Sequence, residues 1–140
     1  MSHSSTNFNS NLGILLLRFA TGGLMLFHGI AKLTHGHEHI KGLLAEKGLP
    51  QFLWLGVPLT EVIAPLLLIL GVFTRLSGLG IALVMVFSIF LAHSADAFTI
   101  TEYGGLATEL NLLFLFGGLS LFFIGGGKYA LYKPENDWLK

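Results

Sequence analysis

Four ionisable side chains stand within long apolar stretches of the sequence, where they could do proton or metal chemistry. They are His28, Glu61, His93 and Glu109, and we take them as the candidate catalytic residues. A charged group near mid-membrane costs roughly 2.5–3.5 kcal/mol on insertion scales, so such groups normally face a partner or a water-filled cavity. Imidazole and carboxylate groups exchange protons and are also ligands of zinc, iron and manganese. The four residues therefore predict a polar site inside a helical bundle.

Three interpretations of this site stay open. A His–Glu network could exchange protons with a quinone or serve another redox reaction. The two histidines, together with the carboxylates, could instead hold a metal ion or a haem. The network could also be structural and fix the register of the helices by salt bridges. We rank them in the order redox or proton site, structural pairing, metal or haem, because no Glu-x-x-His pair stands within a single helix. Arg18 and Lys32 are the cationic candidates for binding a cofactor.

Four apolar stretches predict the helices that position these residues, at about 13–33, 51–73, 76–95 and 106–124. Each is near the length of about 20 residues that a helix needs to cross a bilayer. Between the first two, Ile40, Leu43 and Leu44 share one helical face, which predicts a short interfacial helix closed by Gly48 and Pro50. The predicted fold class is all-α, an integral membrane four-helix bundle, with residues 1–140 as a single transmembrane domain.

Composition supports the membrane class and excludes others. The chain has 140 residues, of which 53% are hydrophobic and only 11% are charged, whereas soluble domains average about 25% charged residues. The formal net charge is zero, so nothing in the chain favours a nucleic acid as a partner. Cysteine is absent, which excludes dithiol–disulfide chemistry and cysteine-ligated clusters within this chain. The expected partners are the lipid bilayer, a redox protein and further copies of the chain.

Basic residues predict the orientation of the bundle. Four spans place both termini on one side, which holds five lysine and arginine residues against three on the other side. The positive-inside rule then predicts cytoplasmic termini and an external 34–50 segment. At 1.5 Å of rise per residue, His28, His93 and Glu109 fall within roughly 5–10 Å of the midplane on the outer side, and Glu61 falls close to the midplane. The four candidate residues, one from each helix, should therefore share one layer and point into the bundle.

Two prolines disturb the second predicted helix. Pro58 and Pro65 have no N–H group and cannot donate to the carbonyls of Trp54 and Glu61. The sequence therefore predicts a bend between Glu61 and Pro65 and inward-facing partners for the freed carbonyls, because lipid offers none.

The order of several short motifs resembles the DoxX family of small four-helix membrane proteins. The motifs are LLLRFATGGLMLFHGIAKL, EVIAPLLLILGVFTRLSGLGIALVM, YGGLATELNLLFLF and GGGKYAL, and the resemblance covers residues 13–131. Within them, its marks are Gly29 with Lys32, Glu61 followed by Gly71, Thr74 and Arg75, and the GKYAL segment at 127–131.

The resemblance implies a function that composition and spacing do not. The family is similar to the DoxD-type subunit of thiosulfate:quinone oxidoreductase, so the resemblance implies a subunit of a quinone-linked oxidoreductase in the inner membrane of a bacterium or archaeon. Quinone is then the first candidate cofactor, ahead of haem or a metal. The alternative is a non-catalytic membrane scaffold, chaperone or small-solute carrier that recruits a soluble enzyme through its loops.

Overall fold

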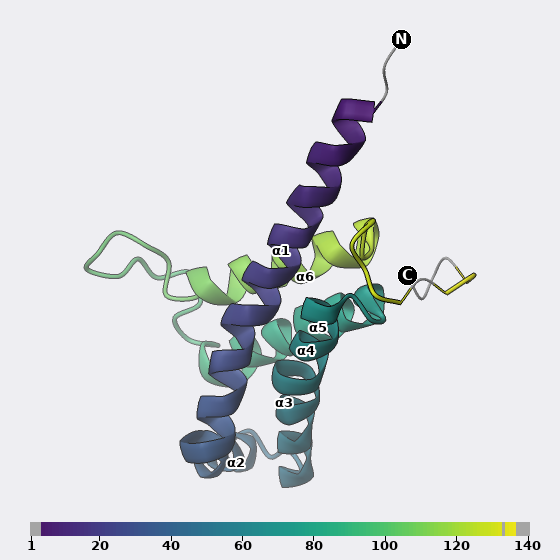
Figure 1. Cartoon of the computed structure of the whole chain (residues 1–140). Helices are drawn as coiled ribbons and strands as arrows, with labels where there is room; N and C mark the ends of the chain where they lie inside the picture. Colours follow the sequence, from purple (N-terminus) through teal and green to yellow (C-terminus); the bar gives the residue numbers. More distant parts are fainter. Residues whose placement is uncertain (1–3, 133, 137–140) are drawn as a thin grey trace.

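The fold is a bundle of apolar helices, shown in Figure 1 as a computed structural model that describes residues 4–132 and 134–136. Helix α1 (Ser4–Ala31) continues through the π-helical turn η1 (Lys32–Gly36) into α2 (His37–Glu46). The second span is built from η2 (Gln51–Leu55), α3 (Gly56–Pro58), η3 (Leu59–Ile63) and α4 (Ala64–Leu70). Helices α5 (Thr74–Ala92) and α6 (Glu109–Ile124) complete the bundle. The predicted all-α membrane bundle is confirmed.

Three helical stretches in the described part of the chain are long and apolar enough to cross a membrane. They are Asn9–Glu46, Gln51–Leu70 and Thr74–Ala92, and α6 is a shorter apolar helix of 16 residues. The predicted interfacial helix is α2, which turns away from α1 and lies across the end of the bundle (Figure 1). Its Ile40 and Leu44 are buried, which follows from the apolar face read in the sequence.

Helix α1 packs through a stripe of residues spaced alternately four and three positions apart. The stripe consists of Arg18, Gly22, Met25, Gly29 and Lys32, and it faces η3 and α4. A Cβ on Gly22 would lie 2.9 Å from the Pro65 carbonyl oxygen, so a small residue is needed there for the helices to approach. Basic side chains thus stand at the two ends of a stripe whose middle is small or apolar.

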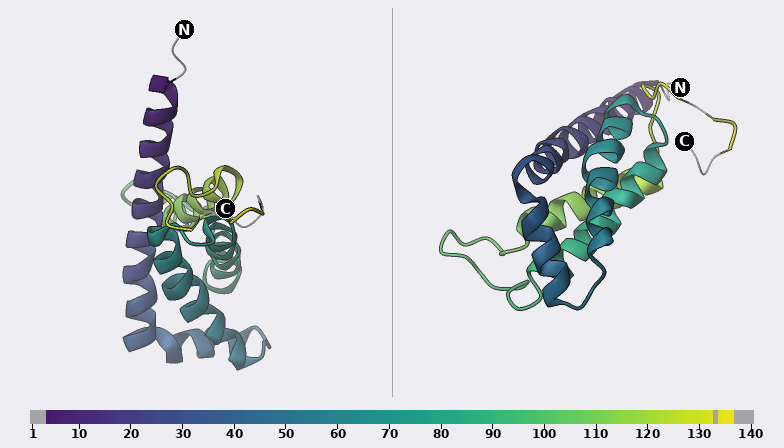
Figure 2. Two further views of the ribbon diagram at one scale, coloured as in Figure 1. Left: turned by 45° about the vertical axis from the view of Figure 1, so that its right-hand side comes forward. Right: turned by 90° about the horizontal axis from the view of Figure 1, so that it is seen from below.

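Helices α5 and α6 form the most extensive helix–helix contact of the bundle. Gly78 and Gly118 face each other, and a Cβ on either would crowd the other's carbonyl oxygen. Ala82, four residues after Gly78, packs on the same side, so the two residues form a small-xxx-small contact surface. Figure 2 shows this pair set against the pair formed by α1 and the second span.

The second span departs from a regular α-helix where the prolines predicted a disturbance. The residues between Pro58 and Ala64 adopt the π-helical turn η3, and α4 resumes with Pro65 in its first turn. A π-helical turn widens the ring of backbone hydrogen bonds and often marks a functional site. The span then ends at Gly71, which has φ 72°, and α5 begins at Thr74.

Candidate functional site

An ion pair between Lys32 and Glu61 forms the centre of the candidate site. Nζ of Lys32 lies 2.6 Å from Oε1 of Glu61. The Glu61 side chain is 1% exposed, whereas the Lys32 side chain is 32% exposed. The second carboxylate oxygen of Glu61, Oε2, is buried and has no hydrogen-bond partner among the residues that the structure describes. A buried carboxylate oxygen without a partner is costly, so it calls for a water molecule, a proton or a ligand.

Local geometry explains why this pair forms. Lys32 is the first residue of η1, and Glu61 is the middle residue of η3, so both sides of the pair come from π-helical turns. Gly29 lies one turn before Lys32 and against the backbone carbonyl of Glu61, where any Cβ would overlap that oxygen. The close approach of the two backbones at Gly29 brings the Lys32 ammonium within reach of the Glu61 carboxylate.

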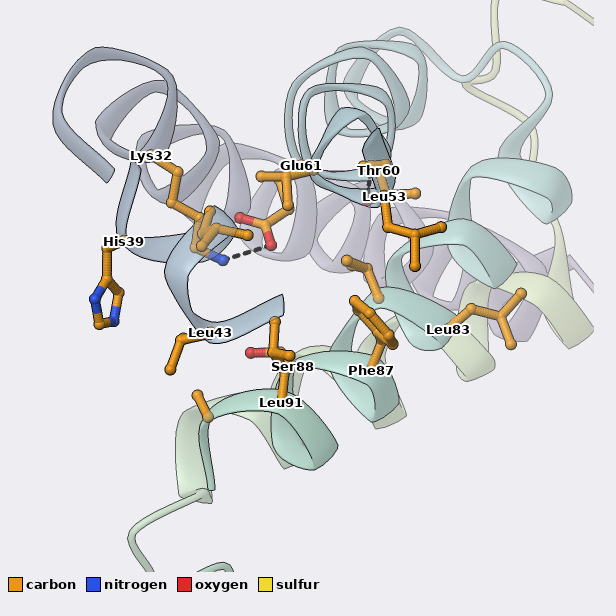
Figure 3. A pocket seen from close by; sticks show the side chains of 15 residues that line it. Lys32, His39, Leu43, Leu53, Thr60, Glu61, Leu83, Phe87, Ser88 and Leu91 are labelled. Atoms are coloured by element: carbon orange, nitrogen blue, oxygen red, sulfur yellow. Dashed lines mark hydrogen bonds and ion pairs between the residues drawn. The ribbon is translucent and has the colours of Figure 1, made fainter. Parts of the chain in front are cut away.

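An apolar cavity of about 360 Å³ opens on one side of the ion pair. In Figure 3, Lys32 and Glu61 lie on one wall and Leu83, Phe87 and Leu91 of α5 lie on the opposite wall. Leu43 of α2 and Leu53 of η2 contribute further apolar surface, and His39 lies at the edge. Apolar pockets of this size with a few polar groups are typical of small-molecule sites.

A second, more polar cavity of about 230 Å³ also reaches Lys32 and Glu61. Its polar lining residues are His28, Ser88, His93 and Asn111. Nδ2 of Asn111 donates to Oγ of Ser88 at 3.2 Å, which joins α6 to α5 across the cavity. Ser88 lines both cavities, so the ion pair and this hydroxyl stand between an apolar and a polar compartment.

Comparison with known proteins identifies the family. The family model described as DoxX matches residues 13–94, more than half of the chain and both members of the ion pair. This chain belongs to the DoxX family. A protein of Haemophilus influenzae, described as uncharacterized, is 32% identical to it over 131 residues, which cover 91% of each chain. No solved structure matches the chain.

Three of the four candidate catalytic residues of this DoxX protein line the same cavity. Glu61, His28 and His93 surround the polar compartment, with the His28 ring set edge-on to Phe114 at a centroid distance of 5.8 Å. Nδ1 of His93 lies 3.2 Å from Oδ1 of Asp96, at the outer end of the compartment. Glu109 is not among the lining residues: its side chain is exposed and folds back over Gly105 at the start of α6. The structure therefore brings three of the four residues together.

The two cationic candidates have different surroundings. Arg18 is buried, and its three nitrogens donate to the carbonyls of Leu68 at 2.9 Å, Ile69 at 2.7 Å and Gly126 at 3.0 Å. The Leu68 and Ile69 carbonyls lie in the last turn of α4 and the Gly126 carbonyl lies just after α6, so these bonds account for the burial of Arg18 without a ligand. The Lys32 side chain is partly exposed and lines both cavities, so it is the cation that could contact a ligand.

Metal ligation fits the DoxX site poorly. Throughout the described residues, no three His, Asp or Glu side chains come together as a group that could hold a metal ion. Around the polar cavity, the Glu61 carboxylate is paired with Lys32, and His93 is paired with Asp96. We therefore derive no chemistry through a metal or a haem.

Reasoning from the sequence missed two residues of the site. Ser88 and Phe114 carry no charge, and nothing in their types marks them within apolar helices. Gly29 was named as a mark of the family resemblance, and its position, seven residues after Gly22 and three before Lys32, places it on the packing face of α1. Asn111 of α6 is a further polar residue of the site, and its side chain bonds Ser88 of α5.

Proposed function

We propose that this DoxX family protein binds a quinone-type ligand beside the Lys32–Glu61 pair and acts as a subunit of a quinone-linked oxidoreductase system. The observation that carries the proposal is the unpartnered Oε2 of Glu61 at the wall of an apolar cavity. A ring with carbonyl or hydroxyl groups could receive a hydrogen bond from Lys32 and exchange a proton with Glu61. The apolar lining suits the rest of such a molecule.

Proton supply is the role proposed for the polar cavity. Glu61 can hold a proton at Oε2, and the imidazole groups of His28 and His93 can each donate and accept a hydrogen bond. Ser88 adds a hydroxyl group and Asn111 adds an amide group to the lining of the same cavity. A cavity of about 230 Å³ is large enough for several water molecules, each with a share of about 30 Å³ in the liquid. These groups would return a proton to Glu61, while the electrons would come from a redox protein.

The whole chain, residues 1–140, would then act as one transmembrane domain of the inner membrane with both termini in the cytoplasm. In that orientation the ion pair lies in the outer half, and α2 lies at the external surface. Glu109 is kept in the proposed set as a surface carboxylate that could pass protons at the mouth of the bundle, because it directly precedes Leu110 and Asn111, which line the polar cavity.

The test is a titration of the protein in nanodiscs with a short-tailed benzoquinone such as decylubiquinone. Binding is measured by the quenching of tryptophan fluorescence. Binding should be saturable in the unaltered chain. The Glu61→Gln variant should bind at least tenfold more weakly, because one lost hydrogen bond to a charged group is worth roughly 1.5–3 kcal/mol. Val84→Trp, which fills the buried wall of the apolar cavity, should abolish binding.

Glu109→Gln is the matched control, since it removes an exposed carboxylate outside both cavities. It should bind as the unaltered chain does. Equal binding by all variants would place the ligand elsewhere and contradict the proposal. A complete lack of binding by the unaltered chain would favour the alternative function, a membrane scaffold, chaperone or small-solute carrier.

A further inference from the structure

The connection between α5 and α6 is a hairpin that projects beyond the helices (Figure 1). Ile100 and Leu106 form an antiparallel bridge, flanked by a hydrogen bond from the Thr101 N–H to the Gly105 carbonyl at 2.8 Å. A second bond, from the Ala107 N–H to the Thr99 carbonyl at 3.0 Å, closes the other side. This pattern makes Ile100 and Leu106 a non-hydrogen-bonded pair, whose side chains lie close together on one face.

The apolar side chains of this hairpin are uncovered. Phe98 is 85% exposed, Ile100 is 73% exposed and Tyr103 at the tip is 90% exposed. The charged residues of the segment 94–108 are Asp96 and Glu102, and it contains no lysine or arginine. An exposed apolar surface of this kind normally marks contact with a partner or a membrane.

The polar groups of the hairpin are largely satisfied within it. The hydroxyls of its three threonines donate to backbone carbonyls within the same connection, Thr99 to Asp96 at 2.8 Å, Thr101 to Gly105 at 3.1 Å and Thr108 to Ala97 at 2.6 Å. The N–H of Gly104 donates to the Thr101 carbonyl at 3.0 Å. Backbone that enters a low-dielectric environment must have its polar groups paired in this way.

The position of the hairpin is fixed relative to the bilayer. It joins the ends of two apolar helices, so its base cannot lie far from the membrane surface. Nζ of Lys47, just beyond α2, donates to Oγ of Ser94 at 2.7 Å and ties the base to the end of the interfacial helix. Phe90 and Leu110, at the adjoining ends of α5 and α6, are exposed and continue the apolar surface of the spans toward the hairpin.

We infer that the hairpin with Phe98, Ile100 and Tyr103 is a second membrane-binding element that inserts its apolar side chains into the outer interface of the bilayer. Aromatic residues such as Phe98 and Tyr103 suit the headgroup region, and Tyr103 can keep its hydroxyl in the polar layer. The absence of basic residues from the segment 94–108 means that insertion depends on apolar contact rather than on anionic lipids. The inference does not depend on the proposed quinone function.

Site-directed spin labelling tests the inference directly, because the chain has no cysteine and each introduced cysteine is unique. Single variants Phe98→Cys, Ile100→Cys and Tyr103→Cys would carry a nitroxide in phosphatidylcholine nanodiscs. Power-saturation measurements compare collisions with oxygen, which concentrates in lipid, and with a water-soluble nickel complex. Glu102→Cys, within the same hairpin, and Glu46→Cys, at the end of α2, are the matched controls.

The labels at the three apolar positions should favour oxygen over the nickel complex by several-fold relative to both controls. The ratio of oxygen accessibility to nickel accessibility should stay the same when part of the phosphatidylcholine is replaced by the anionic lipid phosphatidylglycerol. Equal nickel accessibility at all five positions would show that the tip stands in water and would overturn the inference. In that case the exposed apolar face would be available to a protein partner instead.

Discussion

Gly29 of α1 lies directly against the backbone carbonyl of Glu61, and a methyl group at Gly29 would overlap that oxygen. Pro65 cannot donate to this carbonyl, so the usual helical partner of the Glu61 oxygen is missing. A Cα–H contact from a glycine is one of the few partners that a neighbouring helix can offer at this distance. The contact therefore links the proline-disturbed span to the helix that carries Lys32.

Substitution of Gly29 by alanine should force the two spans apart. Overpacking at a buried contact typically costs 1–3 kcal/mol, and here the obstacle is backbone, which cannot rotate away. We expect a lower melting temperature in detergent and loss of the Lys32–Glu61 ion pair. Gly23→Ala, at a helical position where an added Cβ meets nothing within 4 Å, is the control and should be neutral or slightly stabilising. Equal melting of both variants would contradict the close contact.

Removal of one member of the ion pair should be more harmful than removal of both. Lys32→Met leaves the buried Glu61 carboxylate without its cation, and breaking a buried pair costs roughly 3–5 kcal/mol. Because Lys32 is 32% exposed, the lower end of that range is expected. The double variant Lys32→Met, Glu61→Leu should recover most of the lost stability in a thermal melt, since apolar replacements leave no uncompensated charge. Additive losses would show that the two residues are not coupled.

The sequence predicted the class of fold well because hydrophobicity and length determine which segments can span a bilayer. It also predicted α2 and a disturbance near Pro65, since both follow from local pattern and backbone chemistry. It placed the candidate residues by depth alone, which leaves the direction of each side chain undetermined. Glu109 has a suitable depth, yet its position in the first turn of α6 exposes it, and α6 itself begins only at residue 109.

The role of Arg18 could not be predicted for a related reason. Its three acceptors are backbone carbonyls at the ends of distant elements. Every residue has a backbone carbonyl, so the sequence does not show which of them will accept a hydrogen bond from an arginine. The same applies to Arg75, whose Nη1 donates to the carbonyls of Phe122 at 2.6 Å and Phe123 at 2.7 Å. Two arginines thus bind the carboxyl ends of two helices. Their positive charge there also interacts favourably with the negative end of the helix dipole.

Replacement of each arginine by lysine should have unequal effects. Arg18 uses three separate nitrogens to reach three carbonyls, a geometry that one ammonium cannot reproduce. Arg75 uses a single nitrogen for two neighbouring carbonyls, which an ammonium can approach. Each lost hydrogen bond to a charged group is worth roughly 1.5–3 kcal/mol, so Arg18→Lys should lower the melting temperature more than Arg75→Lys. The opposite order would contradict the assignment of Arg18 as the main connection between α1, α4 and the 125–127 segment.

The orientation of the bundle can be tested with the same cysteine-free background. Arg18 and Arg75 stand at one end of the bundle, and Lys32, Lys41 and Lys47 stand at the other. Lys41 and Lys47 lie over the rings of Trp54 and Phe90, with Nζ at 5.3 Å and 5.5 Å from the ring centroids. Both lysines are held over aromatic rings, so we give them less weight in the positive-inside count than free lysines.

Both termini should therefore be cytoplasmic, and α2 should face outward together with the side of the bundle that carries the ion pair. Single variants Glu46→Cys and Lys128→Cys place a thiol at exposed positions on opposite ends. A membrane-impermeant maleimide added to intact cells with a permeable outer membrane should label Glu46→Cys and leave Lys128→Cys unlabelled. After the inner membrane is opened, both should react, which controls for access to each thiol. Labelling of Lys128→Cys in intact cells would reverse the orientation and move the Lys32–Glu61 site to the cytoplasmic half, where protons would have to come from the cytoplasm.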